Sequence, residues 1–205
     1  MPKPNILIIN GSPKKNGNTA LAIQEFIQNA EADCEVMQVG HLQLQSCKAC
    51  GVCKKLGKCV FDDIVNEAAE KLDKADALIV ASPVHFASAT GAVTAFMDRL
   101  FYSSGFDKRY KVGAAIAVAR RGGITSTFDQ LNKYFTISGM PIASGQYWNG
   151  VHGAAPGEAS QDPEGLQQIR TLAQNTVFLI NSIKLGIREF GIPEKEPGIH
   201  TNFVR

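Results

Sequence analysis

Apolar residues along the chain fall into two alternating kinds of segment. Three runs are apolar almost without interruption, at 6–9, 76–81 and 112–118, as expected for strands that are buried on both faces. A weaker strand is predicted at 34–39, where apolar and polar residues alternate, and a fifth at 141–147. Helical segments separate these strands, so the pattern predicts a doubly wound α/β fold around a five-stranded parallel sheet.

Five helices are predicted from apolar residues at helical spacing and from signals at the segment ends. They cover 19–30, 64–72, 90–101, 126–138 and 163–184. Asn18 or Thr19 can cap the first helix, and Asp162, just ahead of Pro163, can cap the fifth. Gly186 is expected to end the fifth helix.

The length of 205 residues and the hydrophobic content of 44% suit one domain with a sizeable core. We expect this domain to span 1–185, with long loops at 46–61 and 147–161 that a minimal open sheet does not need. The tail at 186–205 carries apolar residues such as Phe190 and Phe203. We interpret it as a docked arm, a partner-binding extension or a loose surface segment.

Charge and cysteine usage narrow the functional class. The 21 Lys and Arg residues against 19 Asp and Glu give a net charge of +2, and the basic residues are scattered, so no nucleic-acid partner is expected. The start of the chain lacks a signal-peptide core and no apolar run reaches membrane-spanning length, so we expect no membrane association and a cytoplasmic location. Five cysteines, four of them crowded within 47–59, suit a reducing compartment better than a disulfide framework.

A turn rich in glycine, hydroxyl and amide groups joins the first strand to the first helix, at 10–20. Its candidate ligand-binding positions are Gly11, Ser12, Gly17, Asn18 and Thr19, with Lys14 or Lys15 adding charge. Glycines permit close backbone approach, and a helix N-terminus attracts an anion through its free N–H groups and dipole. The letters match neither the dinucleotide nor the P-loop motif, so a mononucleotide phosphate is favoured over an ordinary strand–helix turn.

Two further loops follow the third and fourth strands, at 82–88 and 119–123. The carboxyl ends of neighbouring parallel strands meet at the switch point of an open sheet, so these loops are expected to share one cleft with the turn at 10–20. Segment 83–86 can flank a flat ring, and Arg120 or Arg121 can stabilise negative charge developing on it. The alternative makes Phe86 a core residue and both arginines solvated.

Four cysteines form a C-x2-C-x2-C-x5-C run of Cys47, Cys50, Cys53 and Cys59. The first three are spaced as in compact iron–sulfur ligand runs. Four thiolates also satisfy a structural zinc site, and a C-x-x-C pair can form a redox disulfide. A loop that carries no metal is a fourth reading, and the residues alone leave all four open.

Taken together, these segments resemble the flavodoxin-like NAD(P)H-dependent FMN reductases, and more closely their iron–sulfur flavoprotein branch. The resemblance covers most of the chain. It rests on the turn at 11–20, the cysteine run followed by Asp62 and Asp63, the 82–84 loop with 98–100 after it, 120–123 and 147–153. It implies a sheet with strand order 2-1-3-4-5 and the cysteine-rich loop after strand 2.

The resemblance also implies roles for individual residues. The FMN phosphate would be held by Ser12, Lys14, Asn18, Thr19 and Ala20. The isoalloxazine would be lined by Pro83, Val84, His85, Phe86 and Ser88, with Gly122 and Gly123 at its other edge. His85 stands where relatives often carry Tyr or another aromatic residue. A [4Fe–4S] cluster would take Cys47, Cys50, Cys53 and Cys59 as ligands, and no side chain need act as a catalytic nucleophile.

The implied function is that of an FMN-dependent oxidoreductase. It would pass electrons between NAD(P)H or a protein donor and a small acceptor such as a quinone or flavin, and a cluster would exchange two-electron for one-electron transfer. A homodimer or higher homo-oligomer is expected by resemblance, with Tyr147, Trp148 and the 150–161 loop as candidate contacts. The competing reading is a noncatalytic flavodoxin-like module that senses redox state or metal.

Overall fold

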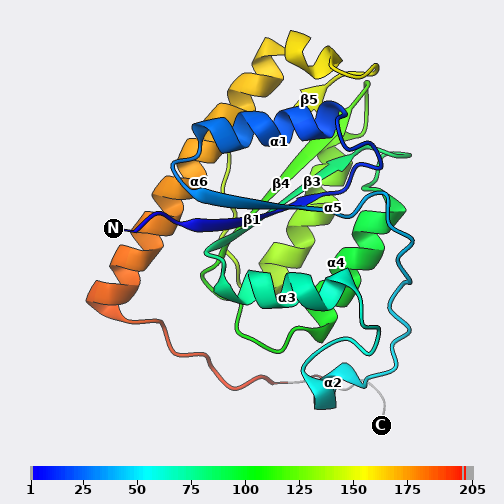
Figure 1. Ribbon diagram of the computed structural model, residues 1–205. Coiled ribbons are helices and arrows are strands. Elements are labelled where there is room, and N and C mark those ends of the chain that lie inside the picture. Colours follow the sequence, from blue (N-terminus) through cyan, green and yellow to red (C-terminus); the bar gives the residue numbers. More distant parts are fainter. Residues whose placement is uncertain (1, 200, 202–205) are drawn as a thin grey trace.

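The computed structural model describes residues 2–199 and 201, and its centre is a parallel sheet in the order β2-β1-β3-β4-β5 (Figure 1). The strands are β1 Asn5–Asn10, β2 Asp33–Gln38, β3 Ala77–Pro83, β4 Val112–Ala119 and β5 Gly150–His152. All four pairings between neighbouring strands are parallel. The predicted five-stranded, doubly wound order 2-1-3-4-5 is therefore confirmed.

Helices cover both faces of this sheet. The helices of the described chain are α1 Asn18–Asn29, α2 Cys53–Leu56, α3 Ile64–Lys74, α4 Gly91–Ser103, α5 Ile124–Ile137, the 3-10 helix η1 Glu158–Gln161 and α6 Pro163–Phe190. In Figure 1, α1 and α6 lie on one side of the sheet, and α3, α4 and α5 lie on the other. This arrangement leaves the carboxyl ends of the strands open to the loops that carry the candidate site.

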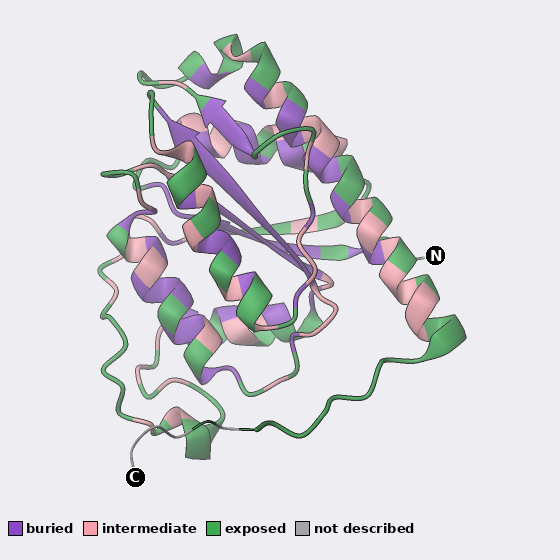
Figure 2. Ribbon diagram, turned by 180° about the vertical axis from the view of Figure 1, so that it is seen from behind, coloured by how far each residue is buried: buried purple, intermediate pink, exposed green. Residues whose placement is uncertain are grey.

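The apolar runs of the central strands explain the two-sided core. Successive strand residues point to opposite faces, so Ile6 and Ile8 of β1 pack with α1 and α6. Leu7 and Ile9 pack with α3, α4 and α5. Every residue of β4 is buried, and Figure 2 shows the central strands almost uniformly buried. Each fully buried Ile or Leu contributes about 1.5–3 kcal/mol, so the loops stand on a rigid support.

Side-chain caps fix where α3, α4 and α6 begin. Asp162 accepts a hydrogen bond from Gly165 N at 2.9 Å and caps α6, as predicted. Helix α1 differs, because its N-cap is Gly17 and no side chain among the described residues caps it. The prediction that Asn18 or Thr19 caps α1 is therefore wrong. Both residues lie inside the first turn, and their backbone N–H groups point out of the helix start.

The fifth strand does not lie where the sequence pattern placed it. Segment 141–147 forms one isolated bridge, between Ile142 and Gly113 of β4, and the strand itself is Gly150–His152. Asn149 holds this strand by donating from Nδ2 to Ala115 O at 3.1 Å and by accepting Ala117 N at 3.0 Å through its carbonyl. These long-range bonds, and not local apolar alternation, decide which residues pair with β4.

Helix α6 is longer than predicted and runs through Gly186 to Phe190. The non-helical tail begins at Gly191, whose φ of 75° suits the residue that ends a helix. The tail is exposed as far as it is described (Figure 2), and Arg109 Nη1 donates to Pro193 O at 3.4 Å. Phe203 lies outside the described residues. Within the described residues, no helix combines the length and the apolar character needed to cross a bilayer.

Candidate flavin and cysteine sites

The turn after β1 is pressed against the beginning of α4. Gly11 N donates to Ala81 O at 2.8 Å, and Thr90 Oγ1 donates to Gly11 O at 3.0 Å. A Cβ atom on Gly11 would lie 2.0 Å from Val93 Cγ2, which is far inside van der Waals contact. Glycine is thus required here for close packing, and the turn has little freedom to move.

Hydrogen bonds within the turn shape it before any ligand arrives. Ser12 N donates to Asn10 Oδ1 at 3.0 Å, and Lys14 N donates to Ser12 Oγ at 3.1 Å. The first backbone hydrogen bond of α1 runs from Leu21 N to Gly17 O at 3.1 Å. The N–H groups of residues 18–20 precede it and have no acceptor one helical turn earlier. Together with the exposed Lys14, they form a donor set suited to a phosphate.

Asn18 uses its side chain differently from the predicted phosphate contact. Its Nδ2 donates to Ala155 O at 2.9 Å, and its Oδ1 accepts Gly157 N at 3.0 Å and Ala159 N at 3.2 Å. The amide therefore braces the loop between β5 and α6 against the start of α1. The backbone N–H of Asn18 remains available to an anion, and the amide retains a second N–H on Nδ2 beyond the one that Ala155 O accepts.

The loop after β3 makes a tight turn with a left-handed backbone. His85 N donates to Ser88 O at 2.9 Å, and Ser88 N donates to His85 O at 3.1 Å. Phe86 and Ala87 between them have φ of 52° and 58°, a region that non-glycine residues seldom adopt. The ring of Phe86 is fully exposed, so the reading of Phe86 as a core residue is wrong.

Helix α5 holds this strained turn in place. Gln130 Oε1 accepts both Ser88 Oγ and Ala89 N at 2.8 Å. Ser126 Oγ donates to Ala87 O at 2.7 Å. The Ser88 hydroxyl proton is thus committed to α5. Gln130 and Ser126 are not among the predicted site residues, because no local motif links them to a loop about 40 residues earlier.

The loop after β4 completes the site. Gly123 has φ of 95°, and a Cβ there would lie 2.7 Å from Val84 Cγ1 and 2.8 Å from Ala87 Cα. This loop therefore lies directly against the turn at 84–87. At Gly122 a Cβ would meet no atom of the described part of the chain within 4 Å, so there is open space beside it. Arg120 and Arg121 are exposed.

A groove borders the third loop on the side of β5. It is lined by Arg121, Gly122, Gly123, Tyr147, Trp148, His152, Asp162 and Gln168, among others. The Tyr147 and Trp148 ring centroids are 4.6 Å apart, and both rings are exposed. The three predicted loops thus converge at the carboxyl ends of β1, β3 and β4, and an aromatic pair stands beside them.

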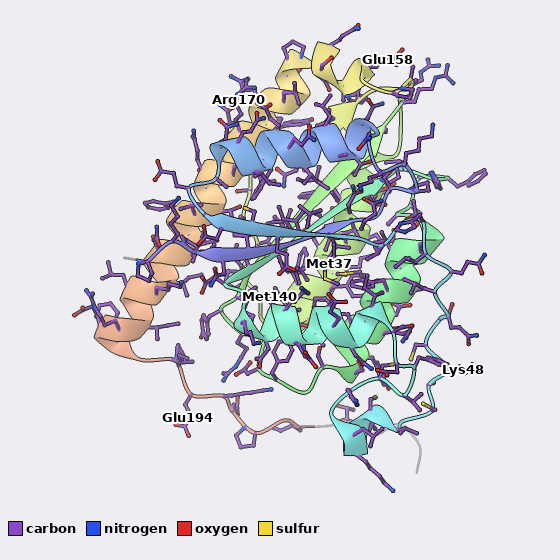
Figure 3. All side chains as sticks on the ribbon, viewed as in Figure 1. Met37, Lys48, Met140, Glu158, Arg170 and Glu194 are labelled. Carbon is purple, nitrogen blue, oxygen red and sulfur yellow. The ribbon has the colours of Figure 1, made fainter. Side chains whose placement is uncertain are left out.

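The four clustered cysteines line a separate cavity. Cys47 and Cys50 are exposed, whereas Cys53 and Cys59 are partly buried, and Phe61, Arg99 and Tyr102 complete the wall. This cavity lies at the C-terminal end of α4, where Cys53 Sγ contacts Tyr102 O at 3.7 Å. The three loops lie at the other end of α4, whose 13 residues rise about 20 Å. Figure 3 labels Lys48 on the cysteine loop and Glu158 at the start of η1, at opposite ends of the molecule.

Buried polar groups fix the last of these cysteines. Asn66 accepts Cys59 N at 2.9 Å through Oδ1 and donates to Cys59 O at 3.1 Å through Nδ2. Arg99 is only 1% exposed and forms an ion pair with Asp63, with Nη1 at 2.7 Å from Oδ2. Burial works against its charge, but hydrogen bonds to Asp63 and to Cys59 outweigh burial and raise the pKa of Arg99 above its usual value.

Comparison with known families agrees with this geometry. Residues 4–154 match the family model described as NADPH-dependent FMN reductase. The chain belongs to the NADPH-dependent FMN reductase family. It is 34% identical over 191 residues to an iron–sulfur flavoprotein of Methanocaldococcus jannaschii, covering 87% of this chain and 98% of that protein. It is 30% identical over 183 residues to an iron–sulfur flavoprotein of Methanosarcina thermophila, covering 86% and 95%. These relatives place it in the iron–sulfur flavoprotein branch.

Solved structures support the fold of this FMN reductase family member. RosB with a bound 8-demethyl-8-formylriboflavin-5'-phosphate matches with a TM-score of 0.69 at 16% identity, covering 98% of this chain and 92% of RosB. A NAD(P)H:quinone oxidoreductase from Methanothermobacter marburgensis matches with a TM-score of 0.64 at 15% identity, covering 84% and 96%. Family and fold together identify the chain as an FMN-dependent oxidoreductase.

Proposed function

We propose that the enzyme passes electrons between NAD(P)H or a protein donor and a small acceptor such as a quinone or a flavin, with FMN held by the three loops. FMN, when bound, accepts a hydride and can release its electrons singly or as a pair. The protein's own part is to bind and orient this cofactor and to leave one face of its ring reachable. The family membership favours this reading over a noncatalytic sensing module.

The observation that carries the proposal is the convergence of the three loops at the switch point of the sheet. The unbonded N–H groups at the start of α1 and the Ser12 turn suit a phosphate. The turn at 83–88 and the open space at Gly122 suit a flat ring between them. We therefore assign the phosphate to Ser12, Lys14, Asn18, Thr19 and Ala20, and the ring to Pro83, Val84, His85, Phe86, Ser88, Gly122 and Gly123.

Thr19 offers a direct test of the phosphate assignment. It is buried in the first turn of α1 and is only 2% exposed. Thr19→Val should preserve its shape, remove its hydroxyl and weaken FMN binding several-fold, measured by quenching of flavin fluorescence. Gln28→Ala, at an exposed position near the far end of α1, is the matched control. Equal affinity in wild type and Thr19→Val would refute the assigned contact.

Turnover tests the proposed reaction. The purified enzyme loaded with FMN should oxidise NADH or NADPH continuously when a benzoquinone or free flavin is supplied. If the protein binds FMN but oxidises neither nucleotide with either acceptor, a protein would remain as the proposed electron donor. Failure to bind FMN at all would overturn the proposal.

We further propose that Cys47, Cys50, Cys53 and Cys59 hold a [4Fe–4S] cluster. Their spacing, their position around one cavity and the names of the relatives support this choice over zinc, a redox disulfide or a metal-free loop. In the described part of the chain, no three His, Cys, Asp or Glu side chains stand ready to hold a metal ion. The exposed loop at 47–50 would therefore have to close on the cavity as a cluster binds.

Single cysteine replacements test the ligand set. Cys53→Ser and Cys59→Ser should each lose iron while FMN binding stays within twofold, because the cavity lies at the opposite end of α4 from the three loops. Cys34→Ser is the matched control, since Cys34 lies on β2 away from the cavity. Equal iron content in all three variants would contradict the assignment.

We also propose a homodimer or higher homo-oligomer with small-molecule donor and acceptor partners and a cytoplasmic location. Exposed aromatic residues support a self-association surface, namely Tyr147 and Trp148 by the groove and Phe178 and Phe190 on α6. Light scattering on the eluting protein should give a mass of at least two chains. A monomer at micromolar concentration would contradict this.

A further inference from the structure

We infer that Arg99 sets the reduction potential of the cysteine site by donating two hydrogen bonds to the Cys59 sulfur. This inference rests on the proposed cluster and adds to it a residue that is not a ligand. Nε and Nη2 of Arg99 each lie 3.3 Å from Cys59 Sγ. Both are N–H donors on a permanently charged group, so they act most strongly on a sulfur that carries negative charge.

The guanidinium bridges the sulfur and a carboxylate. Nη1 donates to Asp63 Oδ2 at 2.7 Å, and Nη2 donates to Asp63 Oδ1 at 2.8 Å. An ion pair alone would explain why this arginine is buried. Nε takes no part in that pair, however, and its hydrogen bond is made to the sulfur. The orientation of the Arg99 side chain thus directs the Nε–H towards Cys59 Sγ, and the ion pair with Asp63 does not require this hydrogen bond.

Surrounding groups hold the arginine in this orientation. The Arg99 guanidinium lies 4.9 Å from the centroid of the Phe61 ring, and Nη1 also donates to Gln45 O at 3.5 Å. Asp63 is fixed in turn because it caps α3 by accepting Val65 N at 3.1 Å. Helix α4 therefore holds the buried, positively charged Arg99 against one of the four thiols. The four lysines of the cysteine loop are exposed instead.

The two hydrogen bonds from Arg99 should raise the reduction potential of the cluster. Reduction adds an electron to the cluster and its thiolates, and N–H donors to sulfur stabilise that added negative charge. Arg99→Gln removes the charge and the fork of donors, so the reduced state should be disfavoured. Asp63→Asn leaves Arg99 in place, keeps an oxygen acceptor for the α3 cap and removes the opposing negative charge. The reduced state should then be favoured.

The test is a redox titration of the intact, cluster-loaded enzyme followed by electron paramagnetic resonance. At the wild-type midpoint potential, the oxidised-to-reduced ratio of Arg99→Gln should be about tenfold higher than that of the wild type. This corresponds to a fall of about 59 mV in the midpoint potential of a one-electron couple. Asp63→Asn should shift it towards reduced, and Arg99→Lys should lie between Arg99→Gln and wild type. Lys48→Gln, which removes an exposed charge from the same cavity wall, should move the midpoint less than Arg99→Gln.

The possible results distinguish a failure of the proposed Arg99 role from a failure of the cluster proposal. Equal potentials in wild type and Arg99→Gln, or shifts of the same sign in Arg99→Gln and Asp63→Asn, would overturn the role of Arg99 while leaving the cluster intact. If Arg99→Gln does not fold, Asp63→Asn decides alone, and a midpoint that stays or falls overturns the inference. A wild-type enzyme that takes up no cluster would overturn the cluster proposal itself, and the Arg99 inference with it.

Discussion

Thr90 Oγ1 donates a hydrogen bond to Gly11 O at 3.0 Å. The bond joins the beginning of α4 to the turn after β1, although the two residues are 79 positions apart. Thr90 also caps α4, because its Oγ1 accepts Val93 N at 3.4 Å. One buried hydroxyl thus couples the proposed phosphate turn to the helix that follows the proposed ring loop.

Thr90→Val should therefore weaken both the fold and the site. Loss of the cap and of the bond to Gly11 should lower the free energy of unfolding by about 1–2 kcal/mol. FMN affinity should fall several-fold, because the turn at 10–20 loses a support. Urea denaturation and flavin titration measure the two effects. Thr90→Ser keeps the hydroxyl and should stay near wild type, and an equally weak Thr90→Ser would argue against the hydrogen bond as the cause.

Gly11 makes a steric prediction. Gly11→Ala would push its Cβ into Val93 Cγ2, and overpacking of this kind costs about 1–3 kcal/mol. Val93→Ala added to the same chain should recover part of that loss in thermal melts. Gly122→Ala, whose Cβ would meet open space, should melt like wild type. A Gly11→Ala variant with unchanged stability would show that the turn yields more easily than its contacts indicate.

Asn18 can be tested for its two roles separately. If the side chain braces the loop before α6, Asn18→Ala should speed hydrogen exchange at residues 155–159, and FMN affinity should fall less than tenfold. Asn16→Ala removes an exposed amide from the same turn and serves as the control. A large loss of FMN affinity with unchanged exchange at 155–159 would instead favour direct phosphate binding by the amide.

Glu158 gives the same loop a dependence on pH. Its carboxylate accepts Ala154 N at 2.7 Å and Ala155 N at 2.9 Å, and these bonds lower the pKa of Glu158 below its ordinary value of 4.5. The depressed folded-state pKa means that the added stability is present above pH 4.5 and is lost as pH falls through the folded-state value.

Exchange protection of the Ala154 and Ala155 amides, corrected for intrinsic rates, should therefore drop at pH 3 relative to pH 7. Glu158→Gln should show reduced protection at pH 7 and little further change on acidification. Protection that is equal at the two pH values in the wild type would rule out the carboxylate as the support of this loop.

Much of the fold could be predicted because its central strands must be apolar on both sides. The middle residues of strands β1, β3 and β4 are buried on both faces of the sheet and are apolar, so these runs are easily recognised in the sequence. Strand β5 has three residues and is placed by the hydrogen bonds of Asn149 to β4. A pattern search over several residues cannot detect a strand that depends on one buried amide.

The candidate site also has a part that could be predicted from the sequence and a part that could not. The loops at 10–20, 82–88 and 119–123 were recognisable because each follows a strand and has a distinct composition. The partners that position them were not, since Asn18 bonds to residues about 140 positions away and Ser88 bonds to Gln130. In the sequence, Arg99 was noted only as part of segment 98–100, which contributes to the family resemblance. Its contact with Cys59 depends on α4 packing beside the cysteine loop.

The most direct measurement is the absorption spectrum of anaerobically purified enzyme together with its iron content. We expect flavin bands, a broad iron–sulfur shoulder beside them and about four iron atoms per chain, as a [4Fe–4S] cluster requires. Flavin bands without iron would contradict the cluster at Cys47, Cys50, Cys53 and Cys59. A spectrum without flavin, even after incubation with FMN, would contradict the central claim that the three loops form an FMN site.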